Sequence, residues 1–193
     1  MENTILNLKM QKAKIDVWGV GTKLITAYDQ PALGAVYKIV SIEDDQGVMH
    51  DTIKLSNNAE KVSTPGKKQV WRITSRAKGK SEGDYITFAD TDVNALDEIN
   101  MFHPTYTYIN KTVRDFDAVP LLVPIYDKGQ LIYDLPSLDE IKAYATKELD
   151  ELWNEYKRVL NPQDYPVDLA KDVWDNKMTL IDNVRKKAHD LSE

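Results

Sequence analysis

Two glycines and a threonine stand close together near the start of the sequence, in Gly19-Val20-Gly21-Thr22. Backbone amides beside glycine can approach an anion closely, and a threonine hydroxyl adds a hydrogen-bond donor, so this combination is suited to holding a phosphate group. The same residues also fit a tight turn after a strand, because the full dinucleotide-binding and P-loop spacings are both missing. The pattern by itself leaves both interpretations open.

A run of basic residues is the second candidate for binding chemistry. One acid, Glu60, accompanies it, so the run is strongly positive in a chain whose net charge is -6. Such a run attracts phosphorylated ligands or belongs to a solvated hairpin. Only Trp71 is available there for stacking, which disfavours single-stranded nucleic acid. The basic residues are Lys54, Lys61, Lys67, Lys68, Arg72, Arg76, Lys78 and Lys80.

Asp16 and His103 are polar residues in apolar surroundings. A carboxylate inside the run Lys14–Trp18 needs a hydrogen-bond partner or a cation to offset its lost hydration, so Asp16 either orients a ribose or caps the glycine turn. His103 lies between Phe102 and Pro104, and we expect it to be packed or hydrogen-bonded instead of acting as a catalytic base.

The composition restricts the class of protein. The 193 residues are 42% hydrophobic and 29% charged, which is typical of a globular chain. Cysteine is absent, which excludes disulfides and thiolate metal sites, and three scattered histidines form no local zinc motif, so we predict no metal ligands and a cytoplasmic location. The acidic net charge argues against a nucleic-acid partner, and no apolar run reaches the roughly 18 residues of a membrane span.

Short elements are predicted to position these residues. Lys14–Trp18 is predicted to be a strand that runs directly into the glycines. After Pro31–Gly34 the pattern changes to alternating, strand-rich runs that predict three antiparallel pairs. The pairs are Ala35–Ile42 with Val48–Leu55, Gln69–Arg76 with Tyr85–Phe88, and His103–Val113 with Leu121–Tyr133.

Two helices are predicted towards the C-terminus. Ser137 and Glu140 have the spacing of a capping box, and apolar residues recur at three and four positions from Leu138 until Asn161-Pro162. A second helix is expected over residues 167–188. We expect the two helices to form an antiparallel hairpin on the strand-rich module.

Six ordered segments resemble the nicotinate phosphoribosyltransferase family and together span nearly the whole chain: Ile15–Thr22, Gln30–Lys38, Glu60–Lys68, Ser81–Asp84, Asn161–Val167 and Trp174–Lys177. Family members are much longer, and the likeness is to their C-terminal part. The implied fold is α+β to α/β, as in type II phosphoribosyltransferases. Residues 1–34 would end an irregular α/β barrel, 35–135 would form an antiparallel β-rich module, and 136–193 a C-terminal helical hairpin.

The resemblance implies an enzyme of NAD salvage that joins nicotinate to phosphoribosyl pyrophosphate and forms nicotinate mononucleotide, with ATP as a hydrolysed co-substrate. Gly19, Val20, Gly21 and Thr22 match the loop that holds the donor phosphate, with Thr22 as the side-chain contact. Mg²⁺ is expected to bind through the substrate pyrophosphate. The family also implies a homodimer in the full-length form, with no nucleic-acid or membrane partner.

The resemblance assigns no catalytic residue to this chain. The family's nicotinate-binding arginine and aromatic residues, and the histidine that accepts a phosphoryl group from ATP, belong to the N-terminal portion. We therefore expect the chain to be catalytically incomplete without that portion. Lys67 and Lys68 match a family motif, and they either contact an anion or shape the loop. The alternative function is a non-catalytic module that binds a phosphorylated ligand or a partner protein.

Overall fold

The computed structural model describes residues 2–32, 34–58, 61–106 and 108–190, and it forms two compact units, Met1–Tyr37 and Lys38–Glu193. The first unit contains helices α1 (Glu2–Met10) and α2 (Thr22–Ile25). The strand expected at Lys14–Trp18 is wrong, because residues 13–21 carry no regular secondary structure. A lone strand has no ladder to satisfy its backbone, and the described residues of this unit supply no second strand.

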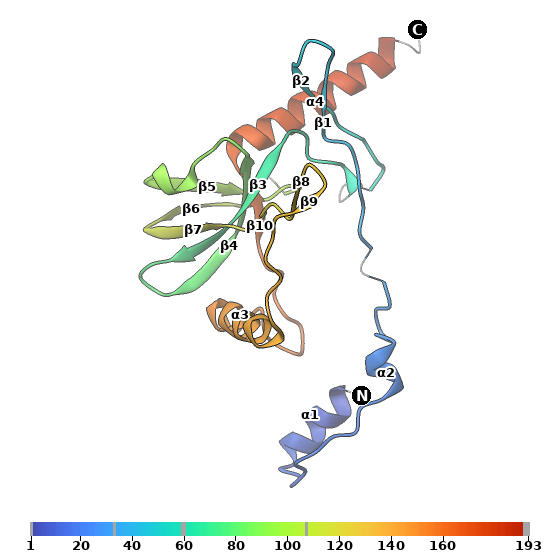
Figure 1. The fold of residues 1–193 in the computed structure, drawn as a ribbon, viewed down its shortest axis with the longest axis vertical. Coiled ribbons are helices and arrows are strands. Elements are labelled where there is room, and N and C mark those ends of the chain that lie inside the picture. The colour runs from blue at the N-terminus through green and yellow to red at the C-terminus, as the bar shows by residue number, and fades with distance from the viewer. Residues whose placement is uncertain (1, 33, 59–60, 107, 191–193) are drawn as a thin grey trace. The chain divides into compact units, whose positions relative to one another are not determined.

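The second unit is built around a six-stranded sheet (Figure 1). Its strand order is β6-β5-β10-β4-β3-β7, and the β10–β4 pair is parallel whereas the other described pairs of this sheet are antiparallel. The strands are β3 (Lys68–Ser75), β4 (Lys80–Phe88), β5 (Glu98–Phe102), β6 (Asn110–Arg114), β7 (Phe116–Pro120) and β10 (Val167–Leu169).

Two of the three expected strand pairs are confirmed. A small hairpin of β1 (Ser41–Glu43) and β2 (Met49–Asp51) closes on the Asp44 side chain, which accepts hydrogen bonds from the amides of Gln46 and Val48, both at 2.9 Å. The pairing of β3 with β4 is also as expected. Both pairs are joined by short loops with turn residues, which is the case that local sequence encodes best.

The third expected pair is wrong. Strand β5 pairs with β6, whereas β7 crosses to pair with β3. The turn expected near residues 127–130 is present, but it joins only the short strands β8 (Tyr126–Asp127) and β9 (Gln130–Leu131). Strand β7 can leave the local hairpin because Phe116 and Ala118 are buried against the core, where Ile73 and Val113 also lie.

Buried residues lie on both faces of the sheet: Trp71 and Tyr85 are in register on one face, and Leu169, in register with Ile86, is on the other. Alternate residues of β4 are buried, in keeping with the two-residue period of a strand, and the buried Trp71 Nε1 donates to Thr87 Oγ1 at 3.0 Å. A 3₁₀ turn, η2 (Val93–Ala95), contributes the fully buried Val93. The buried hydrophobic residues are Trp71, Ile73, Tyr85, Val93, Ile99, Met101, Val113, Phe116, Ala118, Leu169, Ala170 and Val173.

Both C-terminal helices are present, although their bounds differ from those expected. Helix α3 (Leu138–Glu151) begins with the predicted capping box, which is confirmed by reciprocal bonds between Ser137 and Glu140. It ends at Glu151 because the chain then turns to place Trp153 on the sheet, where its Nε1 donates to the Ser81 carbonyl at 3.0 Å. Of the apolar positions of the expected stripe after Glu151, Leu152 and Tyr156 are partly buried outside a helix, whereas Val159 is exposed.

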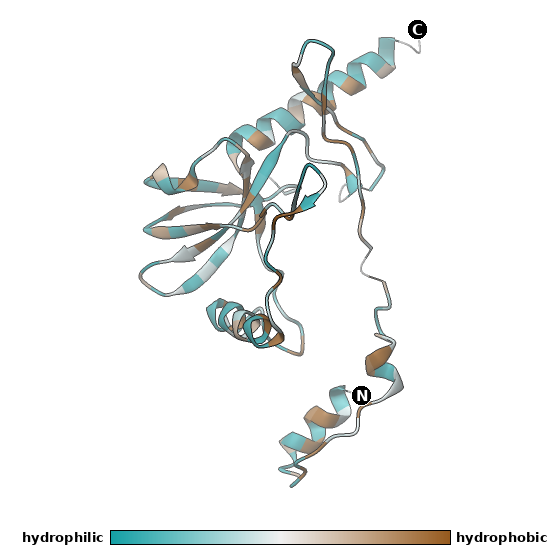
Figure 2. Cartoon of the chain, viewed as in Figure 1, coloured by the Kyte–Doolittle hydropathy of each residue, from teal (hydrophilic) through white to brown (hydrophobic). Residues whose placement is uncertain are grey.

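Helix α4 (Lys171–Asp190) begins later than expected, because residues 167–169 form β10. This strand inserts between β4 and β5. The segment 136–193, predicted as a helical hairpin, therefore contributes a strand to the sheet formed mainly by the segment 35–135. The division of the chain into three parts stays a prediction. Hydrophobic positions recur along the otherwise hydrophilic α4 (Figure 2). Among the described residues, no helix is both long and apolar enough to cross a membrane.

Gly66→Ala is expected to destabilise the second unit by about 2–5 kcal/mol, the combined cost of a left-handed backbone and of overpacking. Gly66 has φ +86°, and an added Cβ would lie 2.6 Å from Phe88 Cε1 and 2.9 Å from Asp51 Oδ2. Urea unfolding measures the loss. Gly129→Ala is the matched control, because Gly129 has φ +80° but open space around its Cα. Equal losses in the two variants would contradict the packing argument.

Candidate functional site

The residues Gly19–Thr22 lead into helix α2 and are all exposed. Gly21 is the N-cap of this four-residue helix, and its carbonyl accepts hydrogen bonds from the amides of Leu24 at 3.0 Å and Ile25 at 3.2 Å. Within the part of the chain that the structure describes, the four amides of Gly19–Thr22 donate to no acceptor. The loop therefore presents free donors to solvent at the start of a helix.

Neither glycine of this loop is required by its immediate surroundings. Gly21 has φ -118°, which any residue can adopt, and a Cβ added at Gly19 or Gly21 would meet nothing within 4 Å. The Thr22 hydroxyl makes no hydrogen bond to the described residues. Asp16 is exposed, so the burial that motivated a capping or ribose-orienting role for it is not present.

Lys68 shapes the loop that precedes β3. Its ammonium donates to the carbonyls of Thr64 at 2.7 Å, Pro65 at 3.2 Å and Gly66. Burial lowers the pKa of Lys68, and the nearby Asp51 carboxylate counteracts part of that effect. Because an ammonium has three protons, these carbonyls use its whole donor capacity. Its geometry thus favours the loop-shaping role over an anion contact.

Lys67 is exposed and lines a hollow of about 560 Å³ between the β1–β2 hairpin and the end of β4. Asp51 and Asp90 line the same hollow. Two carboxylates against one ammonium in the lining oppose the binding of an anion there. The possible anion contact at Lys67 stays a prediction.

Much of the basic run is compensated by groups distant in sequence. Arg76 pairs with Asp115 and Asp117 beside β7, Lys80 donates to the carbonyl of Asp150, and Lys78 lies over the Trp153 ring at 5.4 Å from its centroid. Opposite charges and carbonyls close to each cation reduce the local positive potential. Most basic residues of the β3–β4 hairpin therefore contact neighbouring segments of the fold and are not free to bind a ligand.

Arg72 is the centre of a largely buried ionic network on the sheet. Its Nε lies 3.0 Å from Asp84 Oδ1, and its Nη1 contacts the Glu148 carboxylate of α3. Tyr165 donates to Asp84 Oδ1 at 2.9 Å, and burial raises the pKa of Tyr165 to about 12, so the phenol keeps its proton. The hydrogen bond that Arg72 donates to Asp84 raises the pKa of Arg72. This network joins β3, β4, α3 and the segment before β10.

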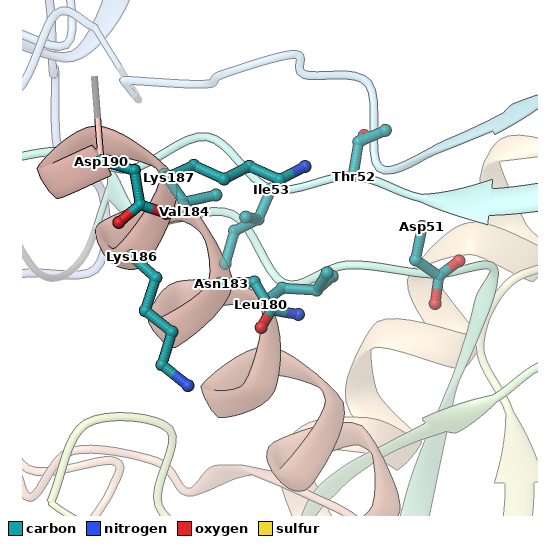
Figure 3. Close-up of a pocket in the computed structure, with 9 residues that line it drawn as sticks. All are labelled: Asp51, Thr52, Ile53, Leu180, Asn183, Val184, Lys186, Lys187 and Asp190. Carbon is teal, nitrogen blue, oxygen red and sulfur yellow. The ribbon is translucent and has the colours of Figure 1, made fainter.

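A separate hollow of about 410 Å³ lies between residues 51–53 and the C-terminal half of α4 (Figure 3). Lys186 and Lys187 line it together with Asp190 and Asp51, so its charges are mixed. None of the predicted site residues lines it. The hollow has no charge bias that would select one class of ligand.

His103 is hydrogen-bonded as expected: its Nδ1 accepts from the amides of Thr105 at 3.1 Å and Tyr106 at 2.9 Å. Sequence reasoning did not single out Lys177, which is 7% exposed on α4. The signal was available, because Lys177 follows Val173 by four residues on the stripe of α4 that faces the sheet. In the described ranges, no group of three or more histidine or acidic residues could hold a metal ion.

Comparison with known proteins identifies the relatives of this chain. Residues 67–177 match the family model described as nicotinate phosphoribosyltransferase C-terminal domain. The chain is 54% identical to the nicotinate phosphoribosyltransferase of Bacillus subtilis over its whole length but spans only 39% of that protein, and 31% identical to the Dictyostelium discoideum protein of the same name, of which it covers 32%.

A solved structure supports the same relationship. The crystal structure of human nicotinic acid phosphoribosyltransferase matches 62% of this chain with a TM-score of 0.56 and 28% identity, and 24% of the human chain is covered. The mixed helix and strand content of the chain agrees with the expected fold class. The chain therefore belongs to the nicotinate phosphoribosyltransferase family and corresponds to the C-terminal portion of its longer members.

Proposed function

We propose that this chain is the C-terminal part of an enzyme that joins nicotinate to phosphoribosyl pyrophosphate and releases nicotinate mononucleotide and pyrophosphate, with hydrolysis of ATP. The names of the relatives support the activity, and the chain spans only 39% of the Bacillus subtilis protein, which supports a missing catalytic portion. A cytoplasmic location, suggested by the cysteine-free sequence, and a homodimer of the full-length form are parts of the same proposal.

Within that enzyme, the Gly19–Thr22 loop is proposed to hold the 5′-phosphate of the ribosyl donor. The observation that carries this proposal is the set of exposed, unpaired amides at this loop, beside the free hydroxyl of Thr22. A Cβ at Gly19 or Gly21 would clash with no described atom of the chain, so packing does not require glycine there. A ligand that approaches the backbone closely would explain both glycines. Amides aimed at an anion form the kind of concave site that phosphate groups occupy.

Fixing the donor at its phosphate would serve the reaction by orientation. The bond that breaks is at the sugar carbon that carries the pyrophosphate, so the 5′-phosphate does not react. Binding energy at a non-reacting group holds the reacting carbon in line with the incoming nicotinate. Mg²⁺ is implied for the pyrophosphate, but the described residues supply no ligand cluster that fits it.

Thr22→Val is expected to weaken the binding of phosphoribosyl pyrophosphate about 10- to 150-fold, because one hydroxyl bond to a charged group is lost. Titration calorimetry measures the affinity. Thr22 is exposed, so the thermal unfolding midpoint should stay unchanged. Thr22→Ser is the control, since it keeps the hydroxyl and should keep most of the affinity. Unchanged donor affinity in Thr22→Val would reject the assignment of this loop.

A further inference from the structure

A pocket of about 680 Å³ lies in the second unit, where five segments meet. Its lining comes from the loop before β3, from β4, from the residues after β5, from the segment that leads into β10 together with β10 itself, and from α4. The volume is in the range of about 300–1,000 Å³ that is typical of small-molecule sites. The pocket is remote in sequence from the Gly19–Thr22 loop, and none of the residues assigned to the donor lines it.

Lys177 is the residue of this pocket that most needs a partner. Its side chain is 7% exposed, and within the described part of the chain it forms no hydrogen bond or ion pair. Burial lowers the pKa of Lys177, which reflects the cost of keeping its charge away from water. Its Nζ is not among the fully enclosed polar atoms of the described residues, so the ammonium still reaches the pocket. A largely desolvated ammonium without a counter-charge destabilises a fold more than an apolar side chain at the same place.

His103 also lines this pocket, and it interacts electrostatically with the buried Asp168 of β10. Its Nδ1 accepts two backbone amides, so this nitrogen carries no proton and the neutral ring is protonated at Nε2. Val62, Ile86 and Leu169 provide apolar walls. Besides Lys177 and His103, the charged side chain of the described lining is Asp164, which is exposed. Its negative charge disfavours a ligand with several negative charges.

Three of the segments that carry the family resemblance meet at this pocket. Thr64 comes from Glu60–Lys68, Asp164 from Asn161–Val167, and Lys177 from Trp174–Lys177. The proposed donor site uses none of these segments. Their convergence on a pocket with an unpartnered, buried cation is a feature that packing of the chain alone does not explain.

We propose that this pocket binds a small organic carboxylate, whose carboxylate group pairs with Lys177 and accepts a hydrogen bond from His103 while its apolar body packs against Ile86 and Leu169. A single buried ammonium matches one negative charge, and a carboxylate completes the donor capacity that the chain leaves unused. The proposal does not depend on the donor loop or on the assigned reaction.

The test uses benzoate as the anionic probe and benzamide as a neutral probe of the same shape. Benzoate at millimolar concentration is expected to raise the thermal midpoint of the chain, and benzamide is expected to leave it unchanged. Lys177→Met is expected to raise the midpoint without any probe, because a buried charge is removed, and to weaken benzoate about tenfold or more in calorimetry. A purely structural lysine would show the opposite effect on stability.

Lys171→Met is the matched control on the same helix. Lys171 is exposed and pairs with Asp175, so its loss should change neither stability nor benzoate affinity appreciably. The proposal is overturned if benzoate does not bind the chain, or if Lys177→Met lowers the thermal midpoint and leaves benzoate affinity intact. Tighter binding of phenyl phosphate than of benzoate would overturn the choice of a carboxylate.

Discussion

The 193-residue chain by itself is expected to form no detectable nicotinate mononucleotide from nicotinate, phosphoribosyl pyrophosphate and ATP. The chain spans 39% of the Bacillus subtilis relative, and we assign it a donor-holding loop but no catalytic residue. A loop that positions one substrate does not supply the groups that bind the base or stabilise the reacting centre. Chromatographic detection of the mononucleotide after long incubation gives a sensitive measurement.

Addition of the separately produced N-terminal portion of the Bacillus subtilis enzyme is expected to restore turnover. The 54% identity over this chain supports a working hybrid interface. The N-terminal portion alone is the control, and it should be inactive. Turnover by the 193-residue chain alone would contradict the proposed incompleteness, and a folded but inactive mixture would favour a non-catalytic binding module.

Arg72→Met is expected to destabilise the second unit by about 3–5 kcal/mol, because it removes the cation from a largely desolvated ionic network. The side chains of Arg72, Asp84 and Glu148 are 20%, 13% and 19% exposed, so the two carboxylates would be left without their counter-charge in a poorly hydrated place. Tyr165 would still donate to Asp84, but one neutral hydrogen bond does not replace a guanidinium. Urea unfolding followed by tryptophan fluorescence measures the loss.

Arg76→Met is the control for this measurement. Arg76 also pairs with two acids, but its side chain is 55% exposed, and Asp115 and Asp117 are 64% and 63% exposed. Solvated pairs contribute little, so we expect hardly any change in the free energy of unfolding. If the two variants lost the same stability, burial of the Arg72 network would not be the reason for its contribution.

Elements with short-range signals were predictable from sequence. The capping box at Ser137 and Glu140 forms between residues three positions apart, and the Asp44 turn is closed by bonds to the next few amides. The β3–β4 pair needs only a short loop. In each case the groups that bond are near neighbours in the chain, so residue type and spacing are sufficient.

Pairings over long sequence distances were not predictable in this way. The second helix is expected to begin at residue 167, yet residues 167–169 form a strand that pairs with β4 on one side and β5 on the other. From sequence, the basic residues are expected to be free to attract a ligand or to face solvent. In the structure, Arg72 instead forms an ion pair with Glu148, which is 76 positions away in the sequence. A local sequence pattern does not specify which side chain or strand, distant in sequence, will pack against it in the folded protein.

By itself, the sequence determined the family resemblance, the hairpins joined by short loops, the presence of both C-terminal helices and the identity of the Gly19–Thr22 loop as the candidate donor site. Tertiary structure alone decided that the basic run is mostly engaged, that Lys68 holds its own loop and that the largely buried Lys177 lines the same pocket as His103. The reason is physical: turns and caps are closed by neighbours, whereas the burial and pairing of a charge depend on segments that meet only when the sheet has formed.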